Sequence, residues 1–523
     1  MNALVSTKTM ETIDSQSIHQ FSIPGLLLME HAGVKGFQSF RERSSIPLSY
    51  DDRIVVVAGG GNNGGDALVM AREAYLEGFR DIAVILLGSH ISQSCALHRA
   101  ICDSLDLPVH QLEFEGDEID QASVSLLSSA RLIIDGFLGT GVRGNLQPAA
   151  RALIALINSC HEKGSFVLSV DVPSGCSDSI SVNQHQVSCD VCVTFGLAKS
   201  SLYHPVRRRY WKKLLIVNPS FPPELLEQAP KEALLASEED LSLEPVDESS
   251  YKNRRGHIAM FAGSEPYTGA SHLASKAAFM SGSGLVTLFC DEEVALTFRQ
   301  QQPSLIVRSQ GGSRSVKPEE LAGSYDVIAV GPGWGDDREE QMVQLLRSDI
   351  PMVCDADGIR TFASVVQQRR VSPHDHAPII LTPHPGEIQQ MMEILNMPLA
   401  AQELGMLGTS ESFIESLKKI ATQFNLVLVY KSHVVWIIDG TKENSTPVVV
   451  DGNNSALGVA GSGDVLTGII ASMLAAKMPA FECALKGVLL HQRAGKIARD
   501  THRWFDSELL LEYIGKAMEE VTI

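Results

Sequence analysis

A glycine-rich turn followed by an aspartate, Gly461–Asp464, is the segment of this chain with the clearest chemical meaning. The apolar run that follows it, from Val465 to Ile470, predicts a helix. The start of a helix offers unpaired backbone N–H groups and the positive end of the helix dipole, and both favour a bound phosphate. A carboxylate there would repel the phosphate, so we interpret Asp464 as a base, or as a group that holds a substrate hydroxyl, during phosphoryl transfer. A helix cap formed by Ser462 or Asp464, with no catalytic role, is the alternative for an isolated motif of this kind.

Other polar residues also follow short β-branched runs, and these runs alternate with helical stretches along the whole chain. Such a pattern predicts doubly wound parallel sheets with both faces covered, and therefore an α/β protein. Ligands of these sheets bind beyond the carboxyl ends of the strands. The unusual residues are found at these ends, which favours two active sites rather than one: Asn62–Asp66, Asp135, Asp171, Gly331–Gly335, Asp355, Asp357, His384 and Lys431.

Length and composition place the chain among globular proteins of two to three domains. It has 523 residues, of which 44% are hydrophobic and 20% charged. The formal net charge of −19 argues against nucleic acid or an anionic membrane as the main partner. We expect no membrane span and no signal peptide, since no run of eighteen apolar residues occurs and the start lacks a basic-then-apolar pattern. Nine cysteines, an odd number, indicate a reducing cytoplasm, and we interpret the Cys189/Cys192 pair as structural.

An acidic segment separates two halves of similar pattern. Residues 224–248 contain nine acidic residues and one lysine, and prolines precede and interrupt this stretch. We therefore predict an N-terminal domain at 1–218, an acidic connector at 219–250 and a C-terminal domain at 251–523. The connector could contain a short helix within residues 234–243.

In the first half, the strand at 53–58 leads into glycines and asparagines that let the backbone approach a ligand closely. We expect Asp66 to open the helix that follows. Asp135 and Asp171 end neighbouring strands, where one carboxylate could act as an acid or base and the other could hold a cation with an Asn or Ser oxygen. Capping of the following turns is the alternative role for both aspartates.

The first half contains five motifs in the order found in a known family. They are IPGLLLMEHAG, GNNGGD, DGFLGTG, VDVPSG and TFGLAK. Over residues 1–218 the chain resembles the N-terminal domain of the bifunctional NAD(P)H-hydrate repair enzymes. The resemblance implies a Rossmann-like epimerase for hydrated nicotinamide cofactors, with Asp171 at the reacting ring. It further implies potassium bound by Asn63, Asp135 and Ser174. The implied substrate-binding residues are Asn62, Asn63, Gly64, Gly65, Asp66, Gly139, Thr140, Gly141, Val142, Arg143, Gly144, Asn145 and Asp171; Ala67 and Ile180 stand where glycine is usual.

The second half carries YTGA, GPGWG, DADG, TPHPGE and GSGDVL, and over about residues 235–515 it resembles the dehydratase domain of the same family. This resemblance implies a ribokinase-like fold in which a nucleotide phosphorylates the hydroxyl of the S-hydrate and loss of phosphate regenerates NADH or NADPH. Asp464 would be the base, and magnesium would bridge the nucleotide phosphates. The implied ligand contacts are Ala270, Gly333, His384 and Asp464 for the hydrate, and Lys431, Ser432 and Gly463 for the nucleotide. Ser432, Ala460 and Gln492 stand where the family usually has glycine.

We therefore predict two three-layer αβα domains that together form an isomerase and a lyase. The first would interconvert R- and S-NAD(P)HX, and the second would dehydrate the S form with ADP or ATP, of which the resemblance to bacterial fusions favours ADP. We expect a cytoplasmic homo-oligomer that uses K⁺ and Mg²⁺. Two alternatives remain open: a ribokinase-like vitamin or sugar kinase that releases a stable phosphorylated product, and a first half that only binds ligands. The presence of Asp135 and Asp171 speaks against the second alternative.

Overall fold

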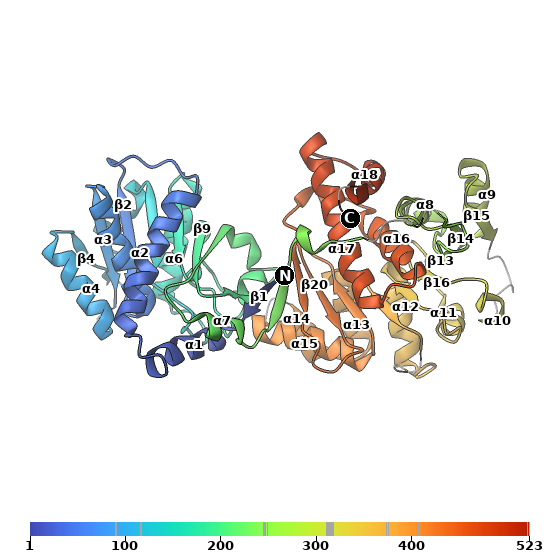
Figure 1. Ribbon diagram of the computed structural model, residues 1–523, viewed down its shortest axis with the longest axis horizontal. Helices are drawn as coiled ribbons and strands as arrows, with labels where there is room; N and C mark the ends of the chain where they lie inside the picture. Colours follow the sequence, from blue (N-terminus) through green and yellow to red (C-terminus); the bar gives the residue numbers. More distant parts are fainter. Residues whose placement is uncertain are drawn as a thin grey trace. The chain divides into compact units, whose positions relative to one another are not determined.

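The computed structural model describes residues 1–88, 91–115, 118–243, 247, 249–309, 318–372, 374, 376–405, 408–519 and 521. The chain divides into two compact units (Figure 1). The first contains Ala3–Ala233 and Met406–Phe413, and the second contains Met1–Asn2, Leu234–Gly405 and Ile414–Ile523. The change from one unit to the other at Ala233–Leu234 lies inside the acidic segment 219–250.

The first unit is built on a parallel sheet whose strands are mostly buried. Its strand order is β11 (Trp211–Val217), β9 (Cys189–Phe195), β8 (Phe166–Val170), β7 (Leu132–Gly136), β2 (Ile54–Gly59), β3 (Ile82–Leu87) and β4 (Val109–Gln111). The chain runs outward from β2 to β3 and β4, and it then returns to β7 and continues to β8 and β9. The strand order therefore reverses between β2 and β7, and a reversal of this kind opens a crevice at the carboxyl ends of the two strands.

Helices cover both faces of this sheet, because right-handed crossovers in opposite directions place their helices on opposite faces. Helices α3 (Asn62–Glu77) and α4 (Gln93–Ser104) lie on one face, together with α2 (Gly25–Arg43), and α5 (Gln121–Ser129) and α6 (Pro148–Glu162) lie on the other. The smaller elements of this unit are β1 (Asn2–Val5), α1 (Thr7–His19), β5 (Phe114–Glu115), β6 (Glu118–Ile119), β10 (Ala198–Lys199), η1 (Ser200–Tyr203), η2 (Arg208–Tyr210) and α7 (Pro223–Glu227).

The second unit has a longer sheet with an antiparallel end. Its strand order is β12 (Ala233–Ala236), β21 (Val448–Asp451), β20 (Val434–Asp439), β19 (Val427–Tyr430), β18 (Ile379–Leu381), β17 (Met352–Cys354), β16 (Val327–Val330), β13 (His257–Phe261), β14 (Leu285–Cys290) and β15 (Ile306–Ser309). Strand β20 is antiparallel to β19 and to β21, and the other neighbours are parallel.

The same crossover rule orders the helices of the second unit. One face carries α8 (Thr268–Met280), α9 (Glu292–Gln301), α16 (Ser462–Ala475), α17 (Ala480–His502) and α18 (Ser507–Glu519). The other carries α10 (Pro318–Leu321), α11 (Glu339–Leu346), α12 (Ala356–Gln367), α13 (Pro385–Ile394), α14 (Pro398–Leu404) and α15 (Ser410–Gln423). The 3-10 turns η4 (Glu265–Tyr267) and η5 (Ser455–Leu457) complete the unit. The prediction of α/β folds with three layers is confirmed.

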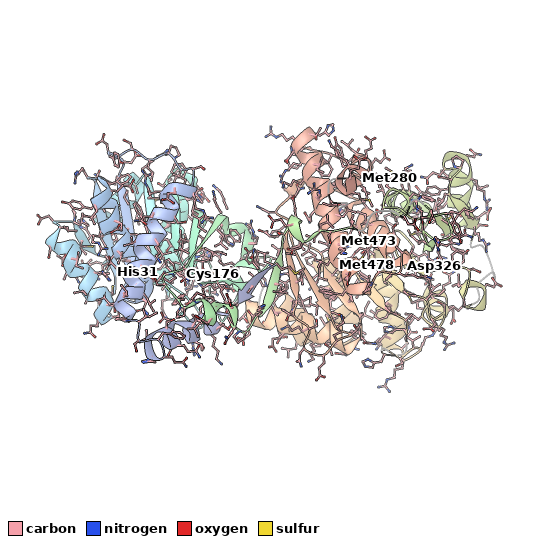
Figure 2. The ribbon with its side chains drawn as sticks, in the orientation of Figure 1. His31, Cys176, Met280, Asp326, Met473 and Met478 are labelled. Atoms are coloured by element: carbon pink, nitrogen blue, oxygen red, sulfur yellow. The ribbon has the colours of Figure 1, made fainter. Side chains whose placement is uncertain are left out.

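Helix α16 is almost wholly buried because it packs very closely on α8. A Cβ atom at Gly468 would lie 2.2 Å from the carbonyl oxygen of Ala274 and 2.7 Å from Cβ of Ala277, so only glycine fits at this crossing. Met473 belongs to the buried core at this helix, and Met280 and Met478 pack against it (Figure 2). Close packing thus fixes the direction in which the N-terminus of α16 points.

The acidic segment is more ordered than a plain connector. Its apolar residues Ala233–Ala236 form β12, which pairs in parallel with β21 and extends the sheet of the second unit. The short helix that the sequence allowed is reduced to the 3-10 turn η3 (Glu238–Asp240).

Cys189 and Cys192 lie buried in β9 as free thiols, which agrees with a structural role. Among the described helices, none combines the length and the hydropathy needed to cross a membrane.

Candidate active sites

A cavity of about 630 Å³ opens in the first unit at the reversal of strand order. Its walls come from α1, the starts of α2 and α3, and the segments that follow β7, β8 and β9. The predicted residues that line it are Asn62, Asn63, Gly64, Asp66, Gly139, Thr140, Gly141, Val142 and Asp171. Four predicted residues lie outside this lining: Gly65, whose Cβ would meet Met29, and Arg143, Gly144 and Asn145, which are exposed.

Helix α3 begins at Asn62, four residues earlier than the sequence suggested. Asp66 therefore lies inside the helix rather than at its start. Glycine and asparagine disfavour helices, but packing on β2 requires them here, since a Cβ at Gly64 would lie 1.8 Å from the oxygen of Gly59. The N-cap residue, Gly61, makes no side-chain capping bond. The open backbone N–H groups of this helix end are therefore available beside the cavity.

Asp171 is held by three donors on a single oxygen. Its φ of 62° is in the left-handed region, which is uncommon for a residue other than glycine. The Oδ1 atom accepts from the buried ammonium of Lys199, from the backbone N–H of Phe195 (3.1 Å) and from the hydroxyl of Thr194 (3.3 Å). Lys199 is a functional residue that the motifs did not reveal, although a lysine that ends a buried run is itself a sign of a paired charge.

Asp135 lies next to the end of β7, and its buried carboxylate accepts from the backbone N–H of Phe137 in the following turn as well as from serines of the neighbouring segment. Its carboxylate accepts from the hydroxyls of Ser174 (2.5 Å) and Ser169 (2.8 Å) and from the backbone N–H of Ser174 (3.0 Å). Burial raises the pKa of Asp135 to about 6, although these bonds oppose the shift.

Asn63 lies beside this group and leaves one oxygen unused. Its Nδ2 donates to the carbonyl of Leu138 (3.1 Å), to which Ser174 also donates (3.2 Å). Its Oδ1 is buried and has no hydrogen-bond partner among the described residues. An unpaired buried oxygen is costly, and together with a serine hydroxyl and a carboxylate it fits a monovalent cation. The structure thus brings together all three residues of the implied potassium site.

In the second unit, Asp464 occupies the third position of α16. Gly461 is the N-cap, with a φ of 88° and no side-chain capping bond, so the alternative of a cap formed by Ser462 or Asp464 is wrong. Ser462 instead pairs with Nε2 of His491 (3.1 Å). Burial, followed by the negative charge of Asp355, raises the pKa of Asp464 to about 7. A carboxyl group with this pKa can accept a proton at neutral pH.

Lys431 is fixed beneath the same helix end. Its Nζ donates to Oδ1 of Asp355 (2.5 Å), and the hydroxyl of Thr467 on α16 donates to Oδ2 (2.7 Å). A Cβ at Gly463 would lie 3.1 Å from this Nζ, so the ammonium lies against the first turn of the helix. Burial opposes the charge, but Asp355 and Glu387 outweigh it and raise the pKa of Lys431. Asp355 is the N-cap residue of α12, but its side chain bonds to Lys431 and Thr467 rather than to the helix, and Thr467 is a contact that the sequence did not reveal.

His384 caps α13 and has a defined tautomer. Its Nδ1 accepts from the backbone N–H groups of Gly386 (3.0 Å) and Glu387 (3.3 Å), so the proton of the neutral ring is on Nε2. Burial and the charge of Lys431 lower the pKa of His384, which favours the neutral ring. Its side chain is 55% exposed, and Nε2 lies 3.3 Å from Oε1 of Glu387. Burial raises the pKa of Glu387 to about 7. Glu387 is another group that the sequence analysis did not single out.

The glycines after β16 form a wall that leaves no room for side chains. A Cβ at Gly331 would lie 1.7 Å from the oxygen of Asp355, and one at Gly333 would lie 2.5 Å from Tyr267 and 3.2 Å from Ala270. The predicted pair Ala270 and Gly333 is therefore brought together. The backbone N–H of Gly335 donates to Oδ2 of Asp357 (2.9 Å).

The three residues of the second half that depart from the family pattern are accommodated locally. The hydroxyl of Ser432 bonds within its own turn, to the carbonyl (2.9 Å) and the N–H (3.1 Å) of Val434. The oxygen of Ala460 accepts from Ser507 (2.7 Å). The amide of Gln492 lies against Gly452, where a Cβ would approach it to 2.6 Å. None of these side chains interrupts the Gly461–Asp464 turn.

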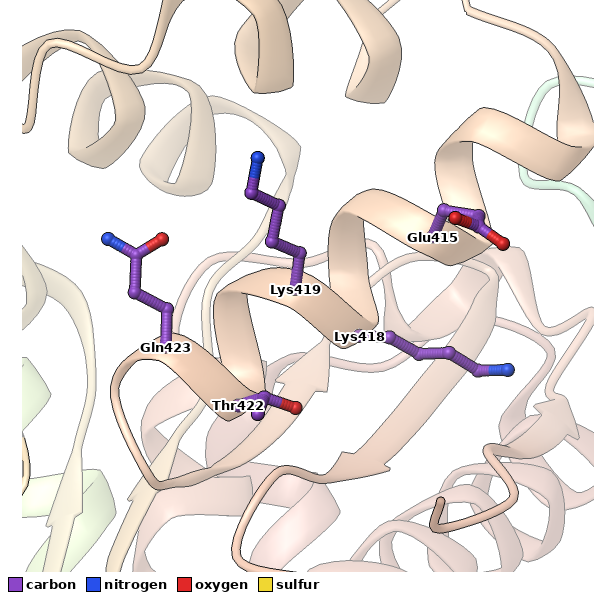
Figure 3. Close-up of a pocket in the computed structure, with 5 residues that line it drawn as sticks. All are labelled: Glu415, Lys418, Lys419, Thr422 and Gln423. Atoms are coloured by element: carbon purple, nitrogen blue, oxygen red, sulfur yellow. The ribbon is translucent and has the colours of Figure 1, made fainter. Parts of the chain in front are cut away.

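A further hollow of about 540 Å³ lies on α15 and includes none of the predicted site residues (Figure 3). Its lining residues are Glu415, Lys418, Lys419, Thr422 and Gln423. All five come from one helix and point away from its buried side. We assign it no role.

Comparison with known proteins connects these sites to one family. A model described as NAD(P)H-hydrate dehydratase matches residues 258–516, and a model of the YjeF-related protein N-terminus matches residues 25–201. The bifunctional NAD(P)H-hydrate repair enzyme Nnr of Archaeoglobus fulgidus is 30% identical over 501 residues, which cover 94% of this chain and 93% of that protein. The chain belongs to the family of bifunctional NAD(P)H-hydrate repair enzymes. The family prediction is thereby confirmed.

Other members of the repair-enzyme family align over nearly the whole chain. The enzyme of the same name from Moorella thermoacetica is 29% identical over 542 residues, 99% of this chain and 97% of that protein. Among solved structures, an ADP/ATP-dependent NAD(P)H-hydrate dehydratase from Bacillus subtilis, co-crystallized with ATP/Mg²⁺, shares 26% identity. It covers 55% of this chain and 99% of its own, with a TM-score of 0.47.

Proposed function

We propose that this protein repairs hydrated nicotinamide cofactors at two sites. The cavity of the first unit interconverts R- and S-NAD(P)HX, and the α16 site of the second unit dehydrates the S form with a nucleotide. The observation that carries the proposal is the position of Asp464, a carboxyl group with a pKa of about 7 in the first turn of α16, next to the ammonium of Lys431. A phosphate acceptor site and a base for a hydroxyl are thereby placed side by side.

The residues of the second site suggest a division of tasks. The open N–H groups of α16 and Lys431 would bind the transferred phosphate, and Asp464 would take the proton of the substrate hydroxyl as its oxygen attacks phosphorus. The ring nitrogen then expels the phosphate, and loss of a proton from the adjacent ring carbon restores the dihydropyridine. The Nε2–H group of His384 and the wall of Ala270 and Gly333 would hold the hydrate.

A magnesium ion would enter this site with the nucleotide. Among the described residues there is no group of three or more His, Cys, Asp or Glu side chains that could hold a metal. Three carboxyl groups interact here with Lys431, namely Asp355, Glu387 and Asp464, and a fourth, Asp357, interacts with Asp464. A polyphosphate therefore needs an additional cation to approach. Mg²⁺ retains waters and phosphate ligands readily, and it would neutralise the phosphates without a protein cage.

In the first site, we propose that Asn63, Asp135 and Ser174 hold potassium. The unpaired Oδ1 of Asn63 and the bonded pair of Asp135 and Ser174 support this. A bound cation would fix the loop after β7, which forms one wall of the cavity. Asn63→Ala should raise the potassium concentration for half-maximal epimerisation about tenfold. An unchanged potassium dependence in this variant would remove the ion from the proposal.

The proposal extends to the setting of the enzyme. All nine cysteines are free and buried, which agrees with a reducing cytoplasm. We expect a homo-oligomer that binds neither nucleic acid nor membranes, in line with the net charge of −19. Light scattering tests the homo-oligomer, and cell fractionation tests the cytoplasmic location.

The decisive assay is absorbance at 340 nm, the band of the reduced cofactor. Purified protein is given mixed R- and S-hydrate, Mg²⁺, K⁺ and either ADP or ATP, and we expect full recovery, with ADP the better donor. If the absorbance at 340 nm does not recover with either nucleotide, the dehydratase proposal is wrong. A stable phosphorylated product from a small alcohol would then favour the vitamin or sugar kinase alternative.

A further inference from the structure

Asp66 is the one carboxyl group of the first cavity that is both buried and unpaired within the described part of the chain. It lines the cavity from α3, its exposed fraction is 9%, and no hydrogen bond or ion pair involves its side chain. Burial raises its pKa well above the ordinary value, and the nearby charges of Asp171 and Asp14 add to this effect. Lys199 acts in the opposite direction but does not reverse the shift. Burial therefore favours the protonated, neutral form of the Asp66 carboxyl group.

Besides Asp171, two other carboxyl groups line this cavity, both from α1: Glu11, which is exposed, and Asp14, whose pKa burial also raises. The ammonium of Lys199 has three N–H groups, and all three are used, by Asp171, by Thr194 (2.8 Å) and by the oxygen of Phe195 (3.0 Å). Asp14 on α1 is only partly buried, which leaves its carboxyl group more open to water. Asp171 is ion-paired through Oδ1, and its Oδ2 makes no bond among the described residues. Of the four carboxyl groups that line the cavity, only Asp66 is almost fully buried and only Asp171 is held by Lys199, whose three N–H groups are all in use.

We propose that Asp66 is a second catalytic residue of the epimerase, which serves one face of the hydrated ring while Asp171 serves the other. This inference rests on the proposed epimerase function. Inversion at a carbon requires bond breaking on one face and bond making on the opposite face. A single carboxyl group can serve only one face, whereas the walls of this cavity carry the buried Asp66 in addition to Asp171.

The proton balance of the step is simple. The Asp66 carboxyl group gives its proton to the hydroxyl, the C–O bond breaks, and water leaves as the ring nitrogen forms a double bond to the same carbon. A second water then adds from the opposite face, its oxygen bonds to that carbon, and its proton passes to Asp171. One proton has moved from Asp66 to Asp171, and the reverse reaction returns it.

The test separates inversion from exchange of the hydroxyl oxygen. Each purified epimer is incubated in H₂¹⁸O with potassium, without nucleotide, and both inversion and ¹⁸O uptake are followed above the rate without enzyme. Asp66→Asn should slow inversion about 100-fold or more. It should still exchange oxygen in the epimer whose hydroxyl faces Asp171, in those molecules in which Asp171 has taken a proton from solvent, because the protonated group can expel water on its own face and take the proton back when water returns. Asp171→Asn should exchange only the other epimer.

Control variants keep the result interpretable. Asp51→Asn changes an exposed aspartate outside the cavity and should leave inversion unchanged. Asp66→Glu keeps the acid and should recover part of the inversion rate, which also serves if the asparagine variant folds poorly.

Three results would overturn the inference: inversion at the normal rate in Asp66→Asn, loss of both inversion and exchange in this variant when it is folded, or exchange of the same epimer by both variants. A wild-type protein that inverts neither epimer would instead contradict the proposed epimerase function itself.

Discussion

Asp464→Asn is expected to slow the nucleotide-dependent recovery of absorbance at 340 nm by about 10³-fold, the range of a lost general base. The reason is local, because Asp464 is a carboxyl group beside Lys431 in the first turn of α16 with a pKa near neutrality. Epimerisation should be unchanged, since the cavity of the first unit lies elsewhere in the sequence. Recovery with S-hydrate as the only substrate measures this loss directly.

The pH dependence of the dehydration rate provides a second test of Asp464 as the base. Because burial raises the pKa of Asp464 to about 7, the wild-type rate should rise as pH passes through this value and the base ionises.

The raised pKa of Asp464 also affects the stability of the fold. The Asp464 carboxyl group stabilises the fold at low pH, and this contribution is lost as pH rises through about 7. Asp464→Asn should therefore melt at a higher temperature than the wild type at pH 8. An exposed helix residue, Asp500, offers a matched control as Asp500→Asn. A rate within threefold of the wild type in Asp464→Asn would rule out this base.

Asp171→Asn is expected to stop recovery at the S fraction of mixed hydrate, with R-hydrate inversion reduced about 10³-fold. The substitution also leaves the buried ammonium of Lys199 without its carboxylate, which costs about 3 kcal/mol in the free energy of unfolding. The first unit should therefore melt earlier than in the wild type. Recovery of pure S-hydrate should remain normal, because the second unit is untouched.

A double variant separates the two effects of Asp171. Asp171→Asn combined with Lys199→Met removes both charges of the buried pair, so it should regain stability without regaining inversion. Single-turnover inversion and thermal melts of the two variants give the comparison. Normal inversion in either would show that the ion pair serves folding alone.

The sequence reveals the sheets and most of the chemistry, because strand ends and glycine turns have local signatures. The Gly461–Asp464 turn and the aspartates of β7 and β8 lie where the pattern predicts. The start of α3 was misplaced because its glycines serve contact with β2, which is a tertiary requirement that local propensity contradicts.

Partnerships between distant side chains were harder to predict. Lys199 bonds to Asp171, which lies 28 positions earlier in the sequence, and Lys431 bonds to Asp355, which lies 76 positions earlier. Nothing in the spacing of these residues joins them, and only the parallel order of the strands brings their ends together. The unpaired states of Asp66 and of Asn63 Oδ1 are likewise properties of burial, which a sequence shows only on average.

The link from Lys431 through Asp355 to Thr467 has a consequence for nucleotide affinity. A free lysine carries about 2 kcal/mol of rotamer entropy, which a phosphate would have to overcome on binding. Here Asp355 has already immobilised the ammonium against α16, and Thr467 has immobilised the carboxylate in turn. The loss of side-chain freedom therefore occurs when the chain folds, and a phosphate bound at the proposed nucleotide site would not have to offset it.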